Sequence, residues 1–131
     1  MEDIKPREVA WRFDGRDWVL RCNNNVLAEV QIVNGGNFGP VLSRKRTLKS
    51  ILQLLAAMLN DYADEQKWVD EKGFAITYTE KQLGRRLSYD TVDRLAPDVM
   101  RMTILAVNET DDEKNAETRQ EEAAVSTSPG T

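Results

Sequence analysis

Apolar and polar side chains alternate in three short stretches near the start of the chain, the pattern of strands with one buried face. These stretches are residues 9–13, 18–22 and 26–33. The first two flank an Asp14-Gly15 pair, which favours a tight hairpin turn, and three consecutive asparagines lead into the third stretch. We therefore predict a three-stranded antiparallel meander at the N-terminus.

The strongest pattern in the chain is an apolar stripe with the spacing of an amphipathic helix. Thr47 is the expected N-cap and Gly73 the expected C-terminal cap, so one long helix should cover about residues 47–72. Packing this stripe on the meander buries both apolar surfaces, which predicts an α+β fold. The stripe comprises Leu48, Ile51, Leu52, Leu55, Met58, Leu59, Tyr62 and Ala63.

Weaker patterns follow the long helix. Residues 74–78 alternate like a short fourth strand. Thr79 and Gln82 have the spacing of a capping box, which predicts the start of a short helix. Pro97 suits the first turn of a second short helix that ends near residue 107.

Beyond that point the composition changes. Residues 108–131 contain few apolar side chains, and their seven acids against two bases account for all of the chain's net charge of −4. The part before them is close to neutral, so the total charge is no guide to its partners. We predict a single α+β domain over residues 1–107 and a disordered acidic tail over residues 108–131.

The side chains that are missing restrict the chemistry. The chain has no histidine, and Cys22 is its only cysteine, which we expect to be a small buried side chain. Zinc sites made of cysteine and histidine, histidine triads and intrachain disulfides are thereby excluded. Acidic residues of the long helix are interpreted as a solvated face. We predict no metal, no cofactor and no enzymatic activity, and, without an apolar run or signal sequence, a cytoplasmic protein with no membrane partner.

Four cations lie at the start of the long helix: Arg44, Lys45, Arg46 and Lys49. Positive charge is unfavourable there because the helix N-terminus is itself partly positive. Positively charged residues at a position where they lower helix stability indicate a bound anion or an acidic partner surface. The alternative is a solvated loop, or one neutralised by the acidic tail. Trp68, which lies on a polar stretch, is a candidate partner anchor, with packing under the last segment as the alternative.

The predicted topology, a meander followed by a helix with a basic start, resembles double-stranded-RNA-binding domains and plant-type three-stranded DNA-binding domains. That resemblance implies phosphate contacts from Arg44, Lys45 and Arg46. The sequence pattern of residues 79–95 resembles that of a helix-turn-helix. They lack the usual turn glycine, however, and the acids Asp90 and Asp93 would face phosphates, so ordinary helix packing is the interpretation.

From these observations we expect a non-enzymatic protein that binds another macromolecule, as an adaptor, an inhibitor or an assembly chaperone. In overall character it is similar to accessory proteins of bacteriophages, including host-defence inhibitors, although no motif carries that resemblance. The alternative is a nucleic-acid-binding protein that uses the four cations, with Arg85 and Arg86 as further contacts. Self-association through Trp68 and an edge strand is a further expectation.

Overall fold

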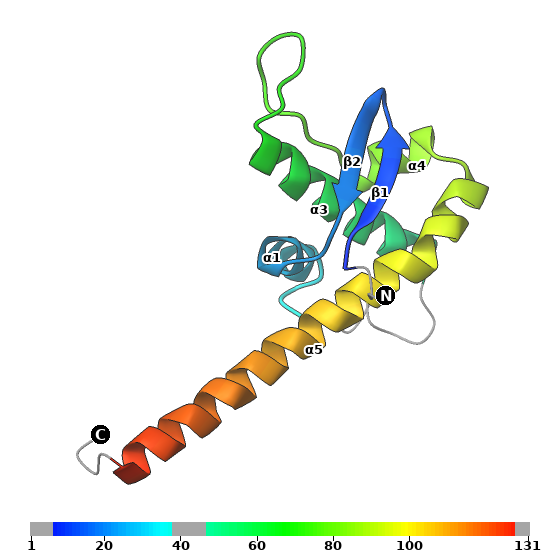
Figure 1. Ribbon diagram of the computed structural model, residues 1–131. Coiled ribbons are helices and arrows are strands. Elements are labelled where there is room, and N and C mark those ends of the chain that lie inside the picture. Colours follow the sequence, from blue (N-terminus) through cyan, green and yellow to red (C-terminus); the bar gives the residue numbers. More distant parts are fainter. Residues whose placement is uncertain (1–6, 38–46, 128–131) are drawn as a thin grey trace.

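The computed structural model describes residues 7–37 and 47–127, with side chains described as far as Asn108 (Figure 1). The described part is α+β, with a two-stranded antiparallel sheet and helices around it. None of the helices within these ranges is long and apolar enough to cross a bilayer. In chain order the elements are β1 (Val9–Phe13), β2 (Arg16–Leu20), α1 (Asn24–Val33), α3 (Leu48–Gln66), α4 (Glu80–Arg86) and α5 (Tyr89–Thr127).

The predicted hairpin is confirmed. β1 and β2 pair in antiparallel register, with Phe13 opposite Arg16, so Asp14 and Gly15 alone form the loop. Both have positive φ, 53° and 75°, as a type I′ turn requires. The right-handed twist of this turn matches that of the strands, which is why an Asp-Gly pair selects a two-residue hairpin. β2 begins two residues earlier than the sequence pattern indicates.

The predicted third strand is wrong, because the stretch that follows the hairpin is helix α1. Asn23 caps it, its side chain accepting a hydrogen bond from the amide of Val26 at 3.1 Å. The buried residues Val26, Leu27 and Val30 have helical spacing, while Ile32 is exposed. A short apolar run fits either period, and here the capping asparagine decides in favour of the helix.

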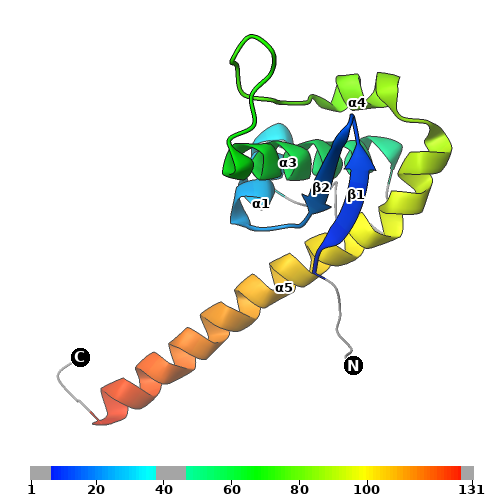
Figure 2. The ribbon, with the colours of Figure 1, turned by 45° about the horizontal axis from the view of Figure 1, so that its top comes forward.

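Helix α3 lies at the centre of the fold. It begins after the predicted cap Thr47, whose side chain accepts from the amide of Ser50, and every residue from 50 to 59 is buried. It contacts β2, α1, α4 and α5, which surround it (Figure 2). The helix is therefore enclosed on several sides, and does not rest with one face on a meander. It ends at Gln66, earlier than predicted, because Lys67 adopts the left-handed conformation that was expected of Gly73.

A connection without regular strands joins α3 to α4. Where a short strand was predicted, the structure has a single antiparallel bridge between Val69 and Ala75. The predicted capping box is confirmed at the start of α4: Thr79 accepts from the amide of Gln82, and the Gln82 side chain accepts from the amide of Thr79. The short helix α4 follows directly.

A single helix, α5, takes the place of the predicted second short helix and continues into residues 108–127. The disorder predicted for residues 108–131 stays a prediction. Ser88 caps it by accepting from the amide of Thr91 at 3.1 Å, and the helix continues through Pro97 to Thr127. Pro97 lacks an amide hydrogen, which explains why the first part of α5 changes direction without ending (Figure 1). Beyond Asn108 the helix extends away from the other elements in both views (Figures 1 and 2).

Candidate functional site

Only one of the four predicted cations can be placed. Arg44, Lys45 and Arg46 lie outside the described residues, so their anion- or partner-binding role stays a prediction. Lys49 lies in the first turn of α3, and its Nζ is 2.8 Å from Oε2 of Glu80 in α4. This pair joins the starts of two helices and partly satisfies the Lys49 charge within the protein.

Trp68, the predicted partner anchor, belongs to an aromatic cluster. Its ring makes edge contacts with Trp18 and Tyr62, at centroid distances of 4.9 and 5.5 Å. The guanidinium of Arg16 lies over it, 4.9 Å from the ring centroid. Trp18 is the buried centre of this cluster, and its Nε1 donates to the carbonyl of Phe13 at 2.8 Å. Trp68 is thus half-buried against aromatic residues of β2 and α3, and not under the last segment as the alternative had it. Its role as a partner anchor stays a prediction.

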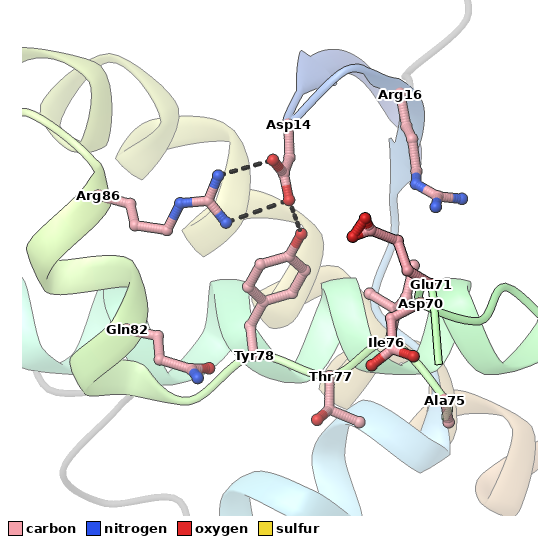
Figure 3. Close-up of a pocket in the computed structure, with 10 residues that line it drawn as sticks. All are labelled: Asp14, Arg16, Asp70, Glu71, Ala75, Ile76, Thr77, Tyr78, Gln82 and Arg86. Carbon is pink, nitrogen blue, oxygen red and sulfur yellow. Dashed lines mark hydrogen bonds and ion pairs between the residues drawn. The ribbon is translucent and has the colours of Figure 1, made fainter. Parts of the chain in front are cut away.

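A polar hollow of about 590 Å³ opens between the hairpin tip, residues 70–78 and α4 (Figure 3). Five charged side chains line it, and they come from segments that are far apart in the sequence. Three of its charges are acidic and two are basic. They are Asp14, Arg16, Asp70, Glu71 and Arg86.

At one end of this hollow Asp14 is held by two partners. The Arg86 guanidinium donates to both carboxylate oxygens, at 2.6 and 3.1 Å, and the Tyr78 hydroxyl donates to Oδ2 at 2.5 Å (Figure 3). The type I′ turn presents Asp14 outward, and the last turn of α4 presents Arg86. The hairpin tip is in this way tied to α4.

These contacts fix the charges of the cluster. Hydrogen bonds from Arg86 and from Tyr78 lower the pKa of Asp14 to about 2. Burial, and then the hydrogen bond to Asp14, raises the pKa of Tyr78 to about 12. Near neutral pH the carboxylate is therefore ionised and the phenol neutral, so neither is poised to exchange a proton as an acid–base catalyst would be. The cluster is best described as a clamp.

The remaining charges of the polar hollow have looser contacts. Oδ1 of Asp70 accepts from the amides of Lys72 and Phe74, which shapes the loop. Glu71 is exposed, and no ion pair joins it to another described residue. Arg16 contacts the Trp68 ring, so Asp70 and Glu71 are left without a dedicated cation.

A second hollow of about 330 Å³ lies between α1, α3 and residues 77–80. Its apolar lining comes from α1 and α3, and its charged lining is acidic, from Glu29 and Glu80. The two hollows share Thr77 and Tyr78. The apolar lining comprises Val30, Val33, Ala56 and Ala57.

The wall between the two hollows is an extended segment, residues 74–79. Thr79 is bonded to α4 through its capping box, and before it only one edge of the backbone is paired. The amide of Ile76 donates to the carbonyl of Trp68 at 3.2 Å. Asn60 bonds both backbone groups of Tyr78, accepting from its amide at 2.7 Å and donating to its carbonyl at 2.9 Å. Successive backbone groups of an extended chain point to opposite sides, so Ala75 and Thr77 direct theirs outward. Both residues are exposed, and no described residue bonds their backbone groups.

The sequence pattern missed both the clamp and the open edge. Asp14 was interpreted only as a turn residue and Arg86 only as a secondary nucleic-acid contact. The alternation of apolar and polar residues over 74–78 did indicate an extended segment. In the described part of the chain this segment forms only an isolated bridge and pairs with no complete strand.

Other potential ligand groups are sparse. Within residues 7–37 and 47–108, no group of three or more acidic or cysteine side chains lies close enough to hold a metal ion. Cys22 is half-buried, and burial raises its pKa to about 11, so its thiol is protonated near neutral pH. No family model, curated protein or solved structure matches this chain.

Proposed function

We propose that this protein is a non-enzymatic interaction protein that binds another protein on the face formed by residues 74–79 and the two hollows beside them. The observation that carries the proposal is the open backbone edge of Ala75 and Thr77. An edge strand with free donors and acceptors is a template for pairing with another chain. Here it is flanked on both sides by space for side chains.

The chemistry of the face supports binding over catalysis. Its strongest charge cluster, the clamp of Asp14, Tyr78 and Arg86, keeps fixed protonation states across the neutral range. Such a cluster positions the walls of a binding surface without taking part in proton transfer. An adaptor, an inhibitor or an assembly chaperone would each use a surface of this kind.

The same face disfavours nucleic acid as its occupant. Five acids line the two hollows against two arginines, and one of those arginines, Arg86, is bound to Asp14. Phosphate groups would be repelled by this lining. A nucleic-acid function would have to use the cations Arg44, Lys45 and Arg46, whose surroundings lie outside the described residues.

Site-specific photo-crosslinking in the cells that make the protein tests the proposal. A photoreactive phenylalanine replaces Phe74, which is 67% exposed beside the open edge, and a matched variant carries it at Tyr89, which is 69% exposed. Tyr89 adjoins the opposite end of α3, next to Thr47 and Leu48. We expect a protein adduct from position 74 and none from position 89. Equal adducts from both positions, or none from position 74, would contradict the proposal.

A further inference from the structure

We propose that the occupant of this face is an extended basic segment of the partner protein, which adds a strand to the edge formed by Ala75 and Thr77. The inference rests on the proposed function and specifies the chemistry of the partner. Three features of the described structure support it: the backbone groups of the edge, the alternation of space on its two sides, and the charge of the lining.

The backbone edge matches the requirement of one added strand. Ala75 and Thr77 are two residues apart, so their amides and carbonyls lie in one row. The opposite row is already occupied, because Ile76 bonds to Trp68 and Tyr78 to Asn60. A partner strand can therefore pair only on the outer side. The backbone amides and carbonyls of a helical partner bond to each other within the helix, so a helical partner would leave this row unpaired.

The two hollows lie where the side chains of an added strand would point. In an extended segment successive side chains point to opposite faces. In Figure 3 the Tyr78 side chain points toward Asp14 in the polar hollow and the Thr77 side chain points the other way, although Thr77 also contributes to the lining of this hollow. An added strand has the same alternation, so every second side chain would enter the polar hollow and the others the apolar one. Main-chain bonds would supply affinity and the hollows specificity.

The charge of the lining selects the partner's side chains. Asp70 and Glu71 line the polar hollow beyond the clamp, and Glu29 and Glu80 line the apolar one. Lys49 pairs with Glu80, whereas no ion pair joins Asp70, Glu71 or Glu29 to another described residue. Lysine or arginine entering the polar hollow would meet Asp70 and Glu71, and an aliphatic side chain would fit between α1 and α3. The expected pattern is alternating basic and aliphatic residues.

A defined peptide tests the inference on the full chain. The probe is a capped hexapeptide of alternating lysine and valine, and its matched control has glutamate in place of lysine. Titration is followed by the amide signals of the isotope-labelled protein in two-dimensional NMR. We expect the lysine peptide to shift the signals of Ala75 and Thr77, and to bind at least about tenfold more tightly than the glutamate peptide.

Two pairs of variants separate the backbone and charge contributions. Thr77→Pro removes the outward amide and should weaken binding of the lysine peptide about tenfold, while Thr77→Val keeps the amide and should change affinity less than about twofold. Glu71→Lys should weaken binding several-fold, whereas Asp93→Lys makes the same charge change on an exposed residue of α5 and should have no effect. The Glu71 pair remains decisive if Thr77→Pro disturbs folding.

Three outcomes would overturn the inference: no binding at millimolar peptide and low salt, equal binding of the two peptides, or signal changes confined to other elements. The photo-crosslinking experiment distinguishes these failures from a failure of the proposed function. An adduct at position 74 with a helical or acidic segment would keep the interaction role and reject the basic strand.

Discussion

The middle of α3 and the extended segment 74–79 lie side by side and differ in how their backbones are satisfied. In the middle of α3 the amides bond within the helix, and residues 50–59 are all buried. In the extended segment the backbone groups of Phe74, Tyr78 and Thr79 bond to the protein, while those of Ala75 and Thr77 face outward. The buried helix is complete by itself, while the segment would gain bonds from another chain. This difference separates the part of the molecule that provides stability from the part for which we propose a binding role.

The largest effect should come from the buried helix. Leu55 is fully buried in α3, so Leu55→Ala should lower the free energy of unfolding by about 2–5 kcal/mol through lost burial and the cavity left behind. Leu48→Ala is the matched control in the same helix, because Leu48 is 47% exposed. Its cost should be clearly smaller. Urea denaturation of both variants measures the difference, and similar losses would show that α3 is not enclosed.

A smaller effect is expected where the two regions meet. Asn60→Ala removes both hydrogen bonds to the backbone of Tyr78, which should cost about 1–3 kcal/mol of unfolding free energy. The amide of Tyr78 should also exchange with solvent much faster, while amides in the middle of α3 keep their protection. Hydrogen exchange followed by NMR distinguishes the two regions. Unchanged protection at Tyr78 would mean that Asn60 does not hold the segment.

The smallest effect should come from the clamp, and it depends on pH. The pKa of Asp14 is about 2 in the folded protein against an ordinary value of 3.8, so its contribution is present above pH 3.8 and is lost as the pH falls through 2. Because the side chain is partly exposed, solvent screening limits this contribution to about 1 kcal/mol.

Asp14→Asn tests this pH dependence and keeps a residue that tolerates the left-handed turn conformation. The variant should be about 1 kcal/mol less stable than the natural chain near pH 6, and the difference should shrink toward pH 2. Urea denaturation at both pH values measures it. A difference that stays constant with pH would assign the effect to packing and not to charge.

Local signals in the sequence predicted local structure well. The Asp14-Gly15 turn, the Thr47 cap and the Thr79 capping box each involve neighbouring residues, and all three are confirmed. The assignment of residues 26–33 failed because a short apolar run suits a strand and a helix alike. The asparagine before it was the better guide, since its cap fixes the helix start.

The candidate site could not be found in this way. Tyr78 and Arg86 reach Asp14 across 64 and 72 residues of sequence, and only the packing of α4 against the hairpin tip brings them together. The open edge likewise depends on Asn60, a helix residue that takes the place of a neighbouring strand. Contacts between distant segments leave no periodic trace in the sequence.

The outer part of α5 has a practical consequence for handling the molecule. From Asn108 to Thr127, at 1.5 Å per residue, the helix reaches about 28 Å beyond the other elements. A dye, an affinity tag or a surface linker attached after its last turn would be carried clear of both hollows. Immobilisation through that end should leave the open edge accessible to soluble peptides.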